Sequence, residues 1–153
     1  MSVGICLLRM FEMPAPAVLW NNGREFDRVT RMDKLVTLCG IHSLGFAIFH
    51  ILFWRIFRWP VELQKVSVPT RAMIQIFNLR LIYLFAGVAA LCFYFQDELV
   101  TTPLGKAIML GMSLFWLGRL IEQFIFLRYH SWMVHLLSVM FGVGAVLFAW
   151  PWL

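Results

Sequence analysis

The sequence predicts an all-α membrane protein in which four transmembrane helices form an up-down-up-down bundle behind a short N-terminal interfacial arm. The first observation is composition. The chain of 153 residues is 61% hydrophobic and 14% charged, with a mean hydropathy of +0.80, whereas soluble domains are about 45–50% apolar and about 25% charged. The second observation is that the apolar residues gather in four long runs separated by short polar segments. Short connections make successive helices antiparallel neighbours.

The N-terminal segment differs from the rest of the chain, and we assign residues 1–33 to the arm and residues 34–153 to the transmembrane domain. Pro14 and Pro16 are expected to break any helix in the arm, and Asn21-Asn22-Gly23 is typical of a turn. The arm lacks a good signal-peptide cleavage site, and its apolar core is short. We therefore expect a partly disordered segment or one that lies at the membrane interface.

The four apolar runs are each long enough to cross a bilayer, which takes about 20 residues. Pro60 is predicted to stop the first helix, and Gln96-Asp97-Glu98 begins a short polar turn. Thr70, Thr102 and Ser131 are the expected N-caps of the other three helices. The predicted spans are about residues 35–57, 70–95, 103–127 and 131–150.

The orientation rests on the Lys and Arg residues that flank the spans. We call side A the membrane face with the N-terminus, the second loop and the C-terminus, and side B the opposite face. Side A holds Arg9, Arg24, Arg28, Arg31, Lys34 and Lys106, and side B holds Arg55, Arg58, Lys65, Arg71 and Arg128. Arg80 and Arg119 can also extend toward side B, so the count over the full sequence does not decide the orientation. Met32 is an alternative start, and it would leave side A only two of these cations. With the acidic pair Asp97-Glu98 on side A, the positive-inside rule then favours a cytoplasmic side B. We expect location in a bacterial inner membrane.

Polar side chains inside the spans gather toward side B. Antiparallel threading, at about 1.5 Å per residue, places residues from all four helices in the same leaflet, whereas the side A half is nearly apolar. This one-leaflet cluster consists of His50, Gln75, Asn78, Arg119, Glu122, Gln123 and His135. We interpret it as a polar pocket that binds a ligand.

Glu122 is the only acidic residue inside a predicted span. A charge in hydrocarbon costs about 3 kcal/mol or more, so it is expected to face the bundle interior and to have a partner. Arg119 lies three residues earlier on the same helical face, a spacing that allows an ion pair. The pair is either a structural clamp or a functional group that moves a proton or holds an anion.

The histidines raise the alternative of a cofactor. His50 and His135 are candidate ligands for haem iron or a metal if they meet in the bundle core, but no local ligand spacing supports this, and we predict no cofactor. Cys39 and Cys92 lie inside spans without a CxxC motif, and we expect them to be buried as small apolar residues.

Three functions remain open after these observations. The first is a non-enzymatic integral membrane protein that binds a small amphipathic ligand, a partner membrane protein or a second copy of itself, besides membrane lipids. The second is a redox protein that binds haem or quinone, and the third is a transport or proton-relay component. No catalytic triad, phosphate loop or nucleotide motif favours an enzyme, and no motif indicates a nucleic-acid partner.

Overall fold

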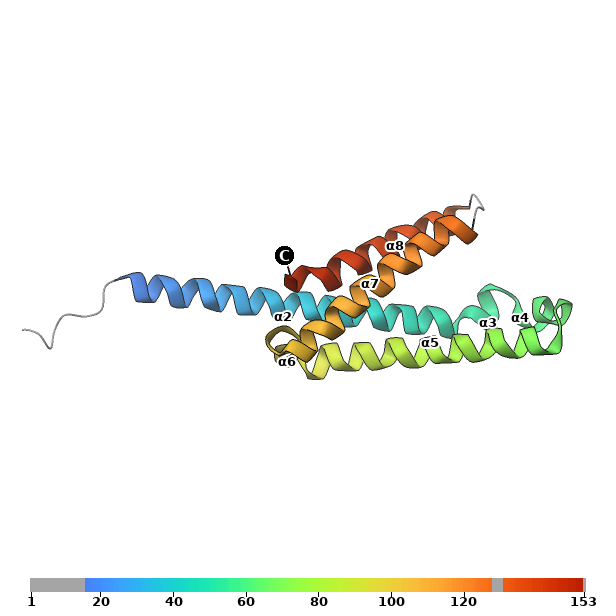
Figure 1. The fold of residues 1–153 in the computed structure, drawn as a ribbon, viewed down its shortest axis with the longest axis horizontal. Coiled ribbons are helices and arrows are strands. Elements are labelled where there is room, and N and C mark those ends of the chain that lie inside the picture. Colours follow the sequence, from blue (N-terminus) through green and yellow to red (C-terminus); the bar gives the residue numbers. More distant parts are fainter. Residues whose placement is uncertain (1–15, 128–130, 153) are drawn as a thin grey trace, which may run out of the picture. The chain divides into compact units, whose positions relative to one another are not determined.

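The computed structural model describes residues 16–127 and 131–152, which form helices and no strand (Figure 1). The chain divides into two units, Met1–Met32 and Asp33–Leu153. Helix α2 (Pro16–Ile51) begins in the first unit. Every contact described below lies within the second unit.

Four helices are long and apolar enough to cross a membrane, and they bear out the predicted all-α, four-helix membrane fold. The first crosses with the later part of α2. The others are separate helices that match the predicted spans 70–95, 103–127 and 131–150 to within two residues at each end. The spans are Thr30–Ile51 of α2, α5 (Val68–Tyr94), α7 (Pro103–Phe126) and α8 (Trp132–Ala149).

The turn predicted at Asn21-Asn22-Gly23 is wrong, because α2 continues through these residues. Pro16 is its first residue, where a proline costs little because the first N–H groups of a helix have no partner within the helix. The preference of these three residues for a turn is weak and is overridden by the long helix on both sides of them. The interfacial position of the arm stays a prediction.

The first connection contains short helical segments in place of a simple loop. The first span ends at Ile51, six residues before the predicted end, and Arg58 reverses the chain in the left-handed region with φ 48° and ψ 40°. Pro60 does not stop a helix, because it lies in the first turn of a new one. The segments are α3 (Phe53–Ile56), α4 (Trp59–Glu62) and the 3-10 turn η2 (Leu63–Lys65).

Side-chain caps start the last three spans. Thr102 accepts a hydrogen bond from the Gly105 N–H at 3.0 Å, and Ser131 accepts one from the Val134 N–H at 3.4 Å, so both predicted caps are confirmed. For α5 the cap is Ser67 and not the predicted Thr70. The side chain of Ser67 accepts a hydrogen bond from the Thr70 N–H at 3.5 Å. The cap lies earlier because Pro69 fits within the first helical turn.

The second connection is the short helix α6 (Gln96–Thr101), where the sequence predicted a turn. It joins α5 to α7 through a tight corner. A Cβ atom on Gly105 would overlap the carbonyl oxygen of Glu98 and lie 2.5 Å from the Cα of Leu99. A glycine therefore lets α7 start directly against the backbone of α6.

Contacts between α2 and α5 show that these helices are antiparallel. Near one end, the Gln96 Nε2 at the start of α6 donates a hydrogen bond to Thr37 Oγ1 at 3.1 Å. Near the other end, His50 meets Asn78. Residue numbers thus rise along α2 as they fall along α5, as the predicted up-down order requires.

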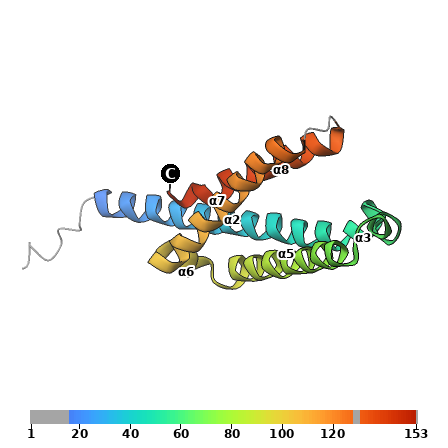
Figure 2. The same ribbon diagram turned by 45° about the vertical axis from the view of Figure 1, so that its right-hand side comes forward.

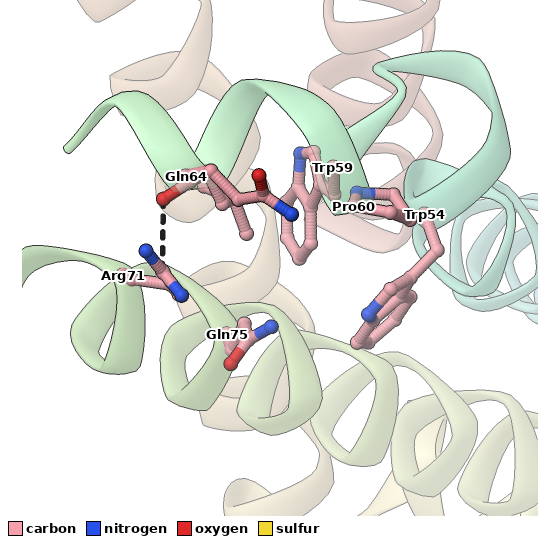
Figure 3. Close-up of a pocket in the computed structure, with 7 residues that line it drawn as sticks. Trp54, Trp59, Pro60, Gln64, Arg71 and Gln75 are labelled. Carbon is pink, nitrogen blue, oxygen red and sulfur yellow. Dashed lines mark hydrogen bonds between the residues drawn. The ribbon is translucent and has the colours of Figure 1, made fainter. Parts of the chain in front are cut away.

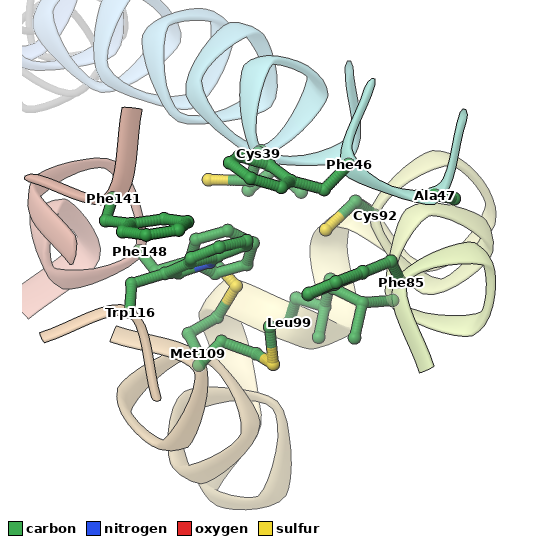
Figure 4. Close-up of a cluster of buried hydrophobic side chains, with 13 residues drawn as sticks. Cys39, Phe46, Ala47, Phe85, Cys92, Leu99, Met109, Trp116, Phe141 and Phe148 are labelled. Carbon is green, nitrogen blue, oxygen red and sulfur yellow. The ribbon is translucent and has the colours of Figure 1, made fainter. Parts of the chain in front are cut away.

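Helices α7 and α8 form the second antiparallel pair (Figures 1 and 2). Ser113 Oγ donates a hydrogen bond to the Ala145 carbonyl at 2.8 Å, and Gln123 Nε2 donates one to the Val134 carbonyl at 2.9 Å. A cluster of aromatic rings around Trp116 of α7 joins the two pairs of helices (Figure 4). The Trp116 ring stacks parallel to the Phe85 ring of α5, with the centroids 5.2 Å apart, and its centroid lies 4.5 Å from that of Phe46 on α2. This core is the centre of the bundle.

Candidate functional site

His50 and Asn78 lie together, and they hydrogen-bond α2 to α5. His50 Nδ1 lies 2.8 Å from Asn78 Oδ1, and Asn78 Nδ2 donates to the backbone carbonyl of His50 at 3.0 Å. The imidazole ring also stacks on Phe53, with the ring centroids 4.4 Å apart. Asn78 is 4% exposed, so this reciprocal pair satisfies polar groups that face no water.

Gln123 is also buried, and it links α7 to α8. Its Nε2 donates to the Val134 carbonyl at 2.9 Å and to Ser138 Oγ at 3.3 Å. His135 follows Val134 on α8 and is exposed. The contacts of Gln123 lie at the end of the bundle where α8 begins, the depth that the sequence predicts.

Arg119 and Glu122 do not face the bundle interior, contrary to the expectation for an acid in a membrane span. Their side chains are 43% and 58% exposed, and Arg119 Nη1 lies 3.7 Å from Glu122 Oε2. The guanidinium carbon of Arg119 lies 5.2 Å from the ring centroid of Phe141 on α8, within the range of a cation–π contact. Sequence spacing predicted the pair but not its rotation toward the outside.

The surroundings of Glu122 form one continuous helical face, which we call the α7 outer face. Its members recur at helical spacing and are largely exposed. At Gly111 and Gly118, an added Cβ would meet no atom within 4 Å. The α7 outer face consists of Leu104, Ala107, Gly111, Leu114, Gly118, Glu122 and Ile125.

Gln75, less than one turn before Asn78 on α5, lines a partly open pocket of about 180 Å³ between α5 and the first connection (Figure 3). We call it the tryptophan pocket. Its lining contains Gln75 but none of the six other members of the predicted cluster. The lining residues are Trp54, Trp59, Pro60, Leu63, Gln64, Arg71 and Gln75.

The single polar pocket that the sequence suggested is therefore not what the structure brings together. The seven residues share one end of the bundle, but they do not line one pocket. His50 pairs with Asn78, Gln123 contacts α8, Arg119 pairs with Glu122, Gln75 lines the tryptophan pocket, and His135 is exposed on α8. Each helix can be rotated about its own axis independently of depth. Depth follows from chain position, whereas rotation depends on how the helices pack.

Sequence reasoning missed the role of His42, a residue of the central core. Its Nε2 lies 3.0 Å from the Met140 carbonyl, and its ring meets Trp116 edge-on at 4.8 Å. A Cβ on Gly144 would lie 2.6 Å from His42 Cε1. The signal in the sequence is Gly142-Val143-Gly144, which indicates close helix packing in membranes without identifying the neighbour.

The two cysteines of the spans, the remaining candidate metal ligands, are packed in the core of the described part of the chain. Cys39 and Cys92 are free and fully buried, as predicted. Among the described residues, no three His, Cys, Asp or Glu side chains are grouped so that they can hold a metal ion. On the surface, Glu62 accepts hydrogen bonds from Lys65 Nζ at 2.8 and 2.9 Å, and these bonds lower the pKa of the Glu62 carboxyl.

Comparisons with models of protein families, with curated proteins and with solved structures find no match to this chain.

Proposed function

We propose that this integral membrane protein is an assembly component that pairs with a second copy of itself through the α7 outer face. The observation that carries the proposal is Glu122, which lies within a membrane-spanning helix and is 58% exposed. A carboxylate that faces lipid costs about 3 kcal/mol at the bilayer centre and less toward the interface, and Glu122 lies four residues before the end of α7. Contact with a protein partner that supplies a cation removes much of this cost.

The charges on α7 complement themselves across a two-fold axis. Two copies with the same orientation in the membrane place identical residues at the same depth. Arg119 and Glu122 are three residues apart, about 4.5 Å along the helix axis. Arg119 borders the α7 outer face on the side of α8, where it lies over the Phe141 ring. Its long side chain lets Glu122 of each copy meet Arg119 of the other, and the two contacts are related by the symmetry that isologous dimers use. The separation of 3.7 Å within one chain leaves both groups incompletely paired.

Small residues allow the helices to approach closely enough for this exchange. Ala107, Gly111 and Gly118 lie on the same face as Glu122, and the space above both glycines is open. Small residues spaced four apart, as in Ala107 and Gly111, are typical of close helix contacts in membranes. These small residues favour a helix as the partner, and the complementary charges of Arg119 and Glu122 favour a second copy of the same helix.

The experiment is a charge-reversal cycle, with dimerisation measured by energy transfer between labelled copies in liposomes. Glu122→Arg and Arg119→Glu each place like charges opposite one another and are expected to weaken self-association more than tenfold. Mixing the two variants restores opposite charges, so mixed dimers are expected to form. If both variants self-associate as the wild type does, or if the mixture stays monomeric, the proposal is wrong.

A steric variant provides an independent control for folding. Gly118→Leu fills the α7 outer face and is expected to shift the protein toward monomer. Gly45→Leu is the matched control, because Gly45 is exposed on α2 and its Cβ would also meet no atom within 4 Å. Equal loss of dimer in both variants would argue against an interface on α7.

The alternative function, a redox protein that binds haem or quinone, can be tested directly. His50 uses Nδ1 in its contact with Asn78, so Nε2 is the nitrogen that a haem or quinone would engage. The absorption spectrum of the purified protein, before and after haem addition, distinguishes the cases. A Soret band would promote the redox function over assembly, and its absence would remove the haem version.

We infer an inner-membrane orientation with the first connection in the bacterial cytoplasm. Arg55, Arg58 and Lys65 lie in this connection, whereas the second connection carries Asp97 and Glu98. Over the whole sequence, Lys and Arg residues are nearly balanced between the two sides, and the acidic second connection favours this direction. A cysteine placed at Lys65 is expected to resist a membrane-impermeant maleimide in intact cells and to react after lysis, and labelling in intact cells would reverse the assignment.

A further inference from the structure

We infer that the tryptophan pocket binds the phosphate group of an anionic lipid at the membrane boundary. This site is separate from the α7 outer face, since its lining comes from α5 and the first connection. It lies where the spans of α2 and α5 end, at Ile51 and Val68. The charged group of a lipid occupies this level of a bilayer.

Arg71 supplies the positive charge, and its orientation is fixed by the protein. Its Nε donates to the Leu63 carbonyl at 2.8 Å (Figure 3). Among the residues that the structure describes, no acceptor is recorded for the terminal amino groups of this guanidinium. A planar guanidinium held in this way presents parallel donors that match phosphate oxygens.

No carboxylate competes for this cation within the pocket. The lining contains two glutamines, two tryptophans, a proline, a leucine and Arg71, and no acid. The nearest acidic residue in the sequence, Glu62, is held by Lys65 at 2.8 Å. The net charge of the lining is therefore positive, and the amides of Gln64 and Gln75 add neutral donors.

The rest of the pocket matches the amphipathic character of a lipid. Trp54 and Trp59 pack against each other with ring centroids 5.0 Å apart, and tryptophans concentrate where headgroups meet hydrocarbon. Below Gln75, the same face of α5 continues with Leu79 and Ile82. An acyl chain attached to a bound phosphate can lie along these residues, which favours a lipid over a free phosphate ion.

The test compares lipids in nanodiscs that contain the full chain. Phosphatidylglycerol in a phosphatidylcholine background is expected to raise Tm, whereas pure phosphatidylcholine and inorganic phosphate are not. Arg71→Gln is expected to weaken the apparent affinity for phosphatidylglycerol about tenfold or more, because a charge-assisted contact is lost. Arg80→Gln is the matched control, since Arg80 is exposed on the same helix and does not line the pocket.

Two results would overturn the inference. Equal loss of the phosphatidylglycerol effect in Arg71→Gln and Arg80→Gln would assign it to general surface charge. A full Tm shift from inorganic phosphate alone would assign the site to a free anion. Both results are independent of dimerisation through α7, which the charge-reversal cycle measures separately.

Discussion

At the scale of single residues, polar side chains in the spans serve mainly to join helices. His50, Asn78 and Gln123 bond across helix pairs, whereas Glu122 points outward. Chain position indicated that all four residues lie toward the same end of the bundle, because helices rise uniformly. Their partners were not predictable, because the rotation of each helix depends on packing that only the assembled bundle defines.

Removing the Asn78 amide is expected to destabilise the protein. Asn78→Ala leaves His50 Nδ1 and the His50 carbonyl without their partner, at a cost of about 1–2 kcal/mol. Unfolding by SDS titration in mixed micelles measures the loss. Leu79→Ala is the neighbouring control, because Leu79 is 56% exposed, and an equal effect there would contradict a specific role for the amide.

Adding a methyl group to Gly144 is expected to disturb the central core. Its Cβ would lie 2.6 Å from His42 Cε1 and 2.9 Å from Trp116 Cγ, and both rings are buried and cannot move aside cheaply. We expect Gly144→Ala to cost about 1–3 kcal/mol, measured as a fall in Tm. Gly142→Ala meets no atom within 4 Å and is expected to leave Tm unchanged or to raise it slightly.

At the scale of elements, hydropathy located the spans well but not every boundary. The starts of α7 and α8 could be predicted from the sequence because Thr102 and Ser131 are recognisable N-caps. Helix α2 extends far before its span, because hydropathy marks where a helix is apolar and not where it begins. The polar residues of α6 are typical of a turn, and a helix of only six residues shows no hydrophobic periodicity that would distinguish it from one.

The corner between α6 and α7 is expected to tolerate no side chain at Gly105. Gly105→Ala would force the start of α7 away from the backbone of Glu98 and Leu99, at a cost of about 1–3 kcal/mol. Circular dichroism during heating would show a lower Tm. Leu104→Ala is the adjacent control, because Leu104 is 72% exposed, and the idea fails if both variants melt together.

At the scale of the whole molecule, the described helices share one aromatic core and leave most of their apolar surface outside it. Only 17% of the 18 residues of α8 are buried, compared with 39% of the most apolar 18-residue stretch of α2. The composition predicted a surface of this kind, since lipid covers apolar side chains that water would not. The sequence located Arg119 and Glu122 on the third span but did not predict that they face outward, because the rotation of a helix depends on its packing.

Helix α8 is also the shortest span, and its tryptophans define its length. Trp132 and Trp150 stand at its two ends and are 78% and 45% exposed, as expected for anchors at both headgroup layers. They are 18 residues apart, or about 27 Å, whereas an average hydrocarbon core is about 30 Å thick. Helix α5, at 27 residues, extends to about 40 Å.

This difference predicts a dependence of stability on lipid chain length. Tm is expected to be highest in bilayers whose hydrocarbon thickness matches the length of α8. Extending α8 by one turn is expected to move this maximum to thicker bilayers. An unchanged peak in the extended variant would contradict the idea. The tryptophan spacing would thereby give the protein a preference for thin regions of membrane, so that hydrophobic mismatch alone can sort it laterally among lipids of different chain length.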